Sequence, residues 1–254
     1  MKEIMLPLFV VCIAFTGLLA QTTSKKKVFT SDIDNFWIAY DSIKTTTDSS
    51  RQLQFINNLY INKGTAGLKA FMQARDYSAV LWVKLIRAYP KFWNSVRPNT
   101  ILVKTKAKEI DASIARFKQL YPELKEAKIY FTVGGLPSGG TTMSNMVLIG
   151  TEITTGNATT DVSEFPDKWL AGVFREQSQD NTIALNIHEY VHTQQSGETE
   201  KLLPMTIAEG SCDFITELVM NKPMHTVYIN YGKAHEAEIK EQFKKEMFNS
   251  YYRN

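Results

Sequence analysis

Two histidines with a glutamate between them constrain this chain more than any other feature of its 254 residues. His188 and His192 are four positions apart, and Glu189 directly follows the first of them. On an α-helix this step turns the side chain by about 400°, so both imidazoles lie on one face, about 40° apart. Two ring nitrogens placed in this way can bind one tetrahedral zinc, and the adjacent carboxylate can take a proton from zinc-bound water. The spacing, written HExxH, therefore predicts a helix and one Zn²⁺ per chain.

A third ligand is expected on the segment that begins at Pro204, a residue that suits the first turn of a helix. Glu209 and Asp213 are four positions apart and share a face of this segment. Glu209 can complete a site of two histidines and one glutamate, with one position open for water. Asp213 can accept the free ring N–H of His188 and fix its tautomer. Gly210 is expected to leave room where the two helices approach each other.

HExxH followed by a helical Glu-x-x-x-Asp resembles the gluzincin clan, the thermolysin-like metallopeptidases. The chain is also similar to a bacterial family of predicted zinc-dependent proteases that is related to a gliding-motility lipoprotein. This resemblance covers roughly residues 30–250, and its most specific parts are residues 129–135, 138–142, 148–152 and 188–195. It implies an α+β, zincin-like (gluzincin) metallopeptidase domain, mostly helical with a small antiparallel or mixed sheet. The HExxH segment would lie on its active-site helix.

The resemblance implies that the chain hydrolyses peptide bonds in a peptide or protein substrate. Glu189 would be the general base that takes a proton from zinc-activated water and passes it to the leaving amine. A second group should stabilise the oxyanion. Tyr231 and His235 follow the zinc-site helices and are the candidates for this donor, with packing or surface positions as the alternative.

Substrate binding in gluzincins uses the edge of a sheet beside the zinc, where an extended peptide adds as a strand. By this analogy, residues 146–153 would be the edge strand, with Ile149 and Gly150 in contact with the substrate. Gly134, Gly135 and Gly140 would allow a backbone to approach closely, because they carry no side chain.

The N-terminus has the pattern of a secretory signal peptide: Lys2, an apolar stretch, and a cleavage point after Ala20. The alternative is an uncleaved anchor, for which the apolar stretch is short. Cleavage would remove Cys12 and leave Cys212 as the single thiol. We therefore expect an exported protein, periplasmic or extracellular, that contacts the membrane only through an uncleaved signal.

The expected organisation is a signal peptide over 1–20, a linker over 21–30 and one domain over 31–254. Within this domain, residues 31–100 are expected to be helical, and residues 101–254 are expected to carry the sheet and the zinc site.

The spacing of apolar residues predicts the main elements of the domain. Residues 31–40, 48–59, 68–73, 77–89 and 104–121 have helical content, residues 128–133 and 146–150 read as strands, and residues 154–181 read as a long polar connection. Such connections often border active sites.

Composition limits the function classes. With 44% hydrophobic residues, 22% charged residues and a net charge of +3, the chain resembles an ordinary globular protein and lacks the basic face of a nucleic-acid binder. Two alternatives to an endopeptidase remain open. One is an aminopeptidase or another zinc amidohydrolase, and the other is a non-enzymatic cell-envelope protein with a zinc-binding or partner-binding cleft. The sequence does not indicate an oligomeric state.

Overall fold

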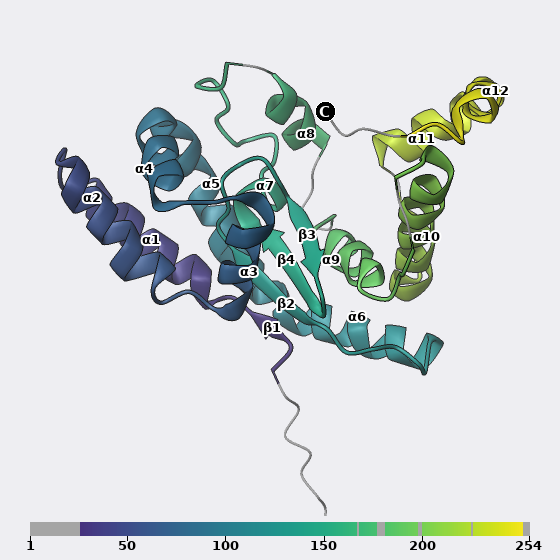
Figure 1. The fold of residues 1–254 in the computed structure, drawn as a ribbon, viewed down its shortest axis with the longest axis horizontal. Coiled ribbons are helices and arrows are strands. Elements are labelled where there is room, and N and C mark those ends of the chain that lie inside the picture. Colours follow the sequence, from purple (N-terminus) through teal and green to yellow (C-terminus); the bar gives the residue numbers. More distant parts are fainter. Residues whose placement is uncertain (1–25, 167, 177–180, 198–199, 225, 251–254) are drawn as a thin grey trace, which may run out of the picture.

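A computed structural model describes residues 26–166, 168–176, 181–197, 200–224 and 226–250. The predicted signal peptide lies outside the described residues. The described part forms a four-stranded mixed sheet with helices on both sides (Figure 1). The strands are β1 (Val28–Phe29), β2 (Lys128–Thr132), β3 (Gly140–Met143) and β4 (Met146–Gly150). No helix within the described ranges is both long and apolar enough to span a bilayer.

The helices fall into a group before the sheet and a group after it. The first group comprises α1 (Ser31–Ile43), α2 (Ser49–Ile56), a π-helical turn (Asn57–Ile61), α3 (Ala66–Arg75), α4 (Ala79–Ala88), α5 (Pro90–Leu102), a 3-10 turn (Val103–Lys106) and α6 (Ala107–Leu120). The second group comprises α7 (Thr151–Thr154), α8 (Trp169–Glu176), α9 (Asn181–His192), α10 (Leu202–Met220), α11 (Val227–Ala234) and α12 (Glu236–Glu246). In Figure 1, α1, α2 and α4 lie to the left of the sheet and α9 to α12 to its right.

The strand order is β1-β2-β4-β3, so the edge differs from the one expected. β4 is parallel to β2 and antiparallel to β3, which places it inside the sheet. Its residues 147–150 are buried, as in strands covered on both faces. The shorter and partly exposed β3 is the edge strand beside β4. The expectation that residues 146–153 form the edge is therefore wrong, and residues 151–154 are helical instead.

Two segments that were expected to be irregular contain secondary structure. Val28 and Phe29, placed in the linker, form β1 and pair with Ile129 and Tyr130 of β2. Two apolar residues are too few for a periodic pattern, and the pairing depends on a partner about a hundred positions away. The long polar connection contains α8, whose Leu170 and Phe174 are buried.

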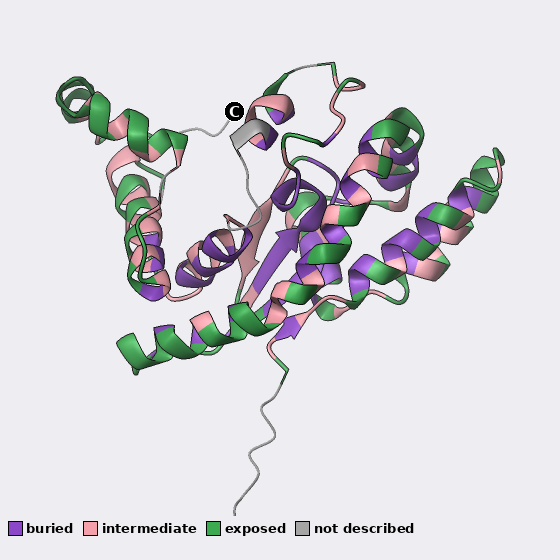
Figure 2. Ribbon diagram, turned by 180° about the vertical axis from the view of Figure 1, so that it is seen from behind, coloured by how far each residue is buried: buried purple, intermediate pink, exposed green. Residues whose placement is uncertain are grey.

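One hydrophobic cluster extends from Val28 to Val219 and joins the N-terminal helices to the sheet. Its largest side chains are aromatic, and two of them pin the segment that follows β2. The Tyr60 hydroxyl donates to the carbonyl of Val133 at 2.6 Å, and the Trp82 indole donates to the carbonyl of Gly134 at 2.8 Å. Figure 2 shows the buried residues around the sheet, whereas α12 is exposed along its length. The N-terminal helices therefore position the turn that leads into β3.

Candidate metal centre

Helix α9 carries the HExxH segment with one face in the core. Ile183, Ile187 and Val191 are buried, and the Tyr190 hydroxyl accepts a hydrogen bond from the Ala127 amide at 2.7 Å, just before β2. The opposite face is partly open, and the two histidine side chains on it are 17% and 21% exposed. The amphipathic pattern of α9 thus directs its imidazoles away from the core and toward α10.

The two histidines and Glu209 of α10 converge on one point. Nε2 of His188 lies 3.3 Å from Oε2 of Glu209, and Nε2 of His192 lies 3.5 Å from the same oxygen. The two rings are 5.0 Å apart between centroids. Three donor atoms of this kind are the set that zinc uses in sites with two histidines and one glutamate.

The other ring nitrogens are both occupied. Nδ1 of His188 lies 2.8 Å from Oδ1 of Asp213, and Nδ1 of His192 lies 2.8 Å from Oε1 of Gln195. Gln195 in turn donates its amide N–H groups to the carbonyl of Ala208 at 2.8 Å and to another acceptor on α10. Since these donations identify the amide nitrogen, the amide oxygen faces His192 and accepts its Nδ1–H. When the Nε2 atoms lose their protons, as zinc binding requires, each then presents a lone pair toward the point that it shares with Glu209.

Gln195 was not among the candidate site residues. It lies three residues after His192, at the end of the 188–195 segment that carries the family resemblance. Neither its position nor the resemblance indicated a contact with a candidate metal ligand. Its role depends on α10 packing against α9, which brings Ala208 and Ser211 within reach of the amide.

Charge at the convergence point favours a cation. Burial would lower the pKa of His188, but hydrogen bonds with Asp213 and Glu209 outweigh it and raise that pKa to about 10. Interactions with the sulfur of Cys212 and with Glu209 raise the pKa of His192 to about 11. The two imidazoles hold the pKa of Glu209 far below its usual range. A divalent cation can supply the same positive charge in place of the protons.

Cys212 offers a second possible donor. A sulfur or nitrogen atom from each of Cys212, His188 and His192 lies within 4.8 Å of the others. However, Sγ lies 3.4 Å from Nδ1 of His192, the nitrogen that also contacts Gln195, and its residue is fully buried. Glu209 instead faces Nε2 of both rings. The chain's residues therefore fit zinc better with Glu209 than with Cys212 as the third ligand.

Glu189 lies between the histidines and the edge strand. A Cβ at Gly140 of β3 would come 2.8 Å from Oε1 of Glu189, so the carboxylate packs directly against this glycine. Burial raises the pKa of Glu189, and the neighbouring His188 and His192 oppose that effect. The carboxylate is thus held beside the candidate metal ligands at the wall of a cavity, where it could accept a proton.

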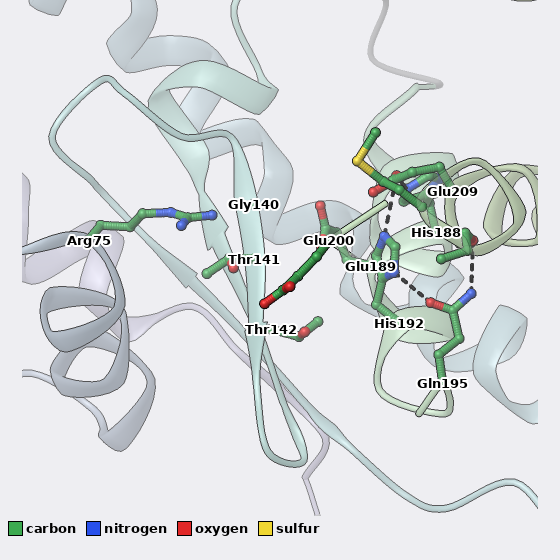
Figure 3. Close-up of a pocket in the computed structure, with 12 residues that line it drawn as sticks. Arg75, Gly140, Thr141, Thr142, His188, Glu189, His192, Gln195, Glu200 and Glu209 are labelled. Atoms are coloured by element: carbon green, nitrogen blue, oxygen red, sulfur yellow. Dashed lines mark hydrogen bonds and ion pairs between the residues drawn. The ribbon is translucent and has the colours of Figure 1, made fainter. Parts of the chain in front are cut away.

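This cavity has a volume of about 520 Å³ (Figure 3). One wall is α9 with the start of α10, the other is β3, and the end of α3 closes one side. It is lined by Arg75, Gly140, Thr141, Thr142, His188, Glu189, His192, Gln195, Glu200, Met205, Ala208 and Glu209.

The predicted oxyanion donors do not reach the cavity. The Tyr231 and His235 rings stack on each other with centroids 3.9 Å apart, and Nδ1 of His235 lies 2.9 Å from the carbonyl of Tyr231. Tyr228, one turn earlier on α11, is the tyrosine that contacts the site: its hydroxyl donates to Oδ2 of Asp213 at 3.0 Å.

The four predicted substrate-binding residues also lie away from the cavity. Gly134 and Gly135 are buried against Tyr77, and Ile149 and Gly150 belong to the inner strand β4. Of the three glycines expected to allow close approach of a backbone, Gly140 lines the cavity. A Cβ at Gly210 would meet no atom within 4 Å, so this residue does not create space between the helices as expected.

Comparison with known proteins relates the chain to one described family. Residues 21–254 match the family described as Gliding motility protein GldB. Neither a curated protein nor a solved structure matches the chain.

Proposed function

Because the chain belongs to the family of the gliding motility protein GldB, we propose that it serves gliding motility in the cell envelope and that its cavity binds Zn²⁺. The proposed ligands are His188, His192 and Glu209. The observation that carries this proposal is the approach of both Nε2 atoms to one oxygen of Glu209, at 3.3 and 3.5 Å. Asp213 and Gln195 support it by holding each ring in the required orientation.

The family description names motility and no reaction. This favours a cavity that binds zinc and a peptide segment of a partner without cleaving it. No strand of the described residues pairs with the outer edge of β3, which could receive such a segment as an added strand. Gly140, Thr141 and Thr142 line the cavity along this strand, which moves the proposed substrate-binding residues from β4 to β3.

Hydrolysis of the bound peptide is the second candidate, and Glu189 is the observation that favours it. A zinc site that only binds a partner or stabilises the fold needs no additional carboxylate beside its ligands, whereas Glu189 lines the same cavity. Zinc would supply Lewis acidity at this point when bound. Glu189 would take a proton from a water molecule and pass it to the leaving amine. The rings of His188 and His192 would be kept in place by Asp213 and Gln195 during this transfer.

Complementation of a gliding strain that lacks the gene separates the two candidates. We expect His192→Ala to lose both zinc and gliding, since it removes a ligand. Glu189→Gln retains the shape of the side chain and removes the base. If Glu189→Gln restores gliding, the function is binding, and if it fails while the purified variant retains stoichiometric zinc, the function is hydrolysis. A wild-type protein without zinc after loading and dialysis would overturn the metal centre.

A further inference from the structure

Arg75 reaches the cavity from the side opposite the proposed zinc ligands. It is the last residue of α3, and its side chain extends toward Gly140 and Thr141 of β3 (Figure 3). His188 and His192 lie beyond β3 in the same view. Arg75 and the proposed zinc ligands thus line the same cavity, together with Gly140, Thr141 and Thr142 of the edge strand.

The position of Arg75 is fixed by the packing of α3. Gly67 of this helix lies so close to Tyr130 of β2 that an added Cβ would come 2.1 Å from the ring. Leu68 and Phe71 on the same face are buried. The helix stops after Arg75 because Asp76 adopts a left-handed conformation with φ of 53°. The backbone that carries Arg75 is therefore held against the sheet.

The guanidinium of Arg75 forms no hydrogen bond or ion pair with the described residues, whereas Arg97 pairs with Asp41 at 2.7 Å and Arg87 donates to Ser49 at 3.0 Å. The positive charge of Arg75 acts on Glu189 and Tyr77, where it favours the ionised forms. Arg75 is also the one arginine or lysine among the residues that line the cavity. Its donors therefore remain available to a molecule inside the cavity.

We infer that Arg75 binds a carboxylate of the molecule that occupies the cavity, which makes the cavity selective for anionic peptides. This inference rests on the proposed zinc-binding function. The planar fork of a guanidinium matches a carboxylate with two parallel hydrogen bonds. The cavity also contains Glu189, Glu200 and Glu209, so a carboxylate is expected to bind at the guanidinium rather than beside these three side chains. The carboxylate is either the C-terminus of a peptide or an Asp or Glu side chain.

The test uses the zinc-loaded full chain and short peptides that end in a hydroxamate, a group that chelates zinc. One probe pair carries a free C-terminal carboxylate or its amide, and a second pair carries Glu or Gln. Dissociation constants are measured for wild type, Arg75→Met, Arg75→Lys and the control Arg87→Met, whose side chain lies outside the cavity. Thermal unfolding of each variant verifies that it folds.

We expect wild type to prefer at least one carboxylate probe over its neutral partner by roughly tenfold. Arg75→Met should abolish this preference without changing the affinity for the neutral probe, Arg75→Lys should retain part of it, and Arg87→Met should retain it fully. The pair that shows the preference identifies the source of the carboxylate. Equal binding within both pairs, or a preference that survives in Arg75→Met, would overturn the role of Arg75 and leave the zinc site standing. Failure of every hydroxamate probe to bind would overturn the zinc-binding cavity itself.

Discussion

Oδ1 of Asp213 lies 2.8 Å from Nδ1 of His188, while the second oxygen of this carboxylate accepts a hydrogen bond from Tyr228 at 3.0 Å. The carboxylate therefore connects three helices: α9, α10 and α11. Because its orientation is held from the side of α11, it can hold the His188 ring with Nε2 toward Glu209. The geometry of the proposed zinc ligand thus depends on a residue that does not itself face the ligand point.

Replacing Asp213 should weaken zinc binding without removing a ligand. We expect Asp213→Ala to lower zinc affinity by about 10-fold to 100-fold, because the His188 ring loses the acceptor that fixes its tautomer. Competition with a chelator of known affinity measures the change. Asp34→Ala is the control, since Asp34 pairs with Lys104 on the surface. An unchanged zinc affinity in Asp213→Ala would contradict the proposed role.

Gln195 should behave in the same way toward His192. Gln195→Leu removes the oxygen that accepts from Nδ1 of His192, and we expect zinc affinity to fall by at least roughly tenfold. The neighbouring Gln194→Leu is a matched control, because Gln194 bonds to the backbone of Lys125 instead. The same chelator competition applies. Equal losses in the two variants would show that the effect is not specific to the contact with His192.

Glu152 should make the free energy of unfolding depend on pH. It is fully buried, and burial raises its pKa from 4.5 to about 7, although its oxygens accept the amides of Gly134 and Leu136. Between these two pH values the folded chain keeps a proton that the unfolded chain releases, so the free energy of unfolding falls as pH rises. Across the whole interval, the free energy of unfolding falls by about 3 kcal/mol through this effect.

The glutamine side chain in Glu152→Gln cannot titrate, so the free energy of unfolding of this variant should not fall with pH in this way. Urea denaturation of both proteins from pH 5 to pH 8 measures the difference, which isolates Glu152 from other titrating groups. We expect wild type to lose stability relative to Glu152→Gln across this range. A difference that stays constant with pH would mean that Glu152 remains charged in the folded protein.

Two glycines of the helices should respond oppositely to alanine. Gly67→Ala places a Cβ against the ring of Tyr130 and should lower the free energy of unfolding by about 1–3 kcal/mol. Gly210→Ala meets no atom within 4 Å on α10 and should raise it by up to about 1 kcal/mol, with zinc affinity unchanged. Denaturation midpoints of the two variants measure both effects. A destabilised Gly210→Ala would reveal a close approach of α9 and α10 at this position.

The local spacing of residues predicted which side chains of the proposed site share a helix face. His188 and His192 share a face because a helix repeats every 3.6 residues, and Glu209 and Asp213 share one for the same reason. This regularity acts within one element, so the sequence carries it directly. The expected strands at 128–133 and 146–150 likewise correspond to β2 and β4, since both are short apolar runs.

The arrangement of elements relative to one another was decided by tertiary packing. The order of the strands made β3 the edge rather than β4, and the packing of α10 on α9 gave Gln195 its contact with His192. The path of α11 brought Tyr228 to Asp213 and left Tyr231 and His235 outside the cavity. Arg75 joined the cavity only because α3 packs on the sheet. Each of these contacts joins separate elements, and no periodicity within one element encodes where a different element will lie.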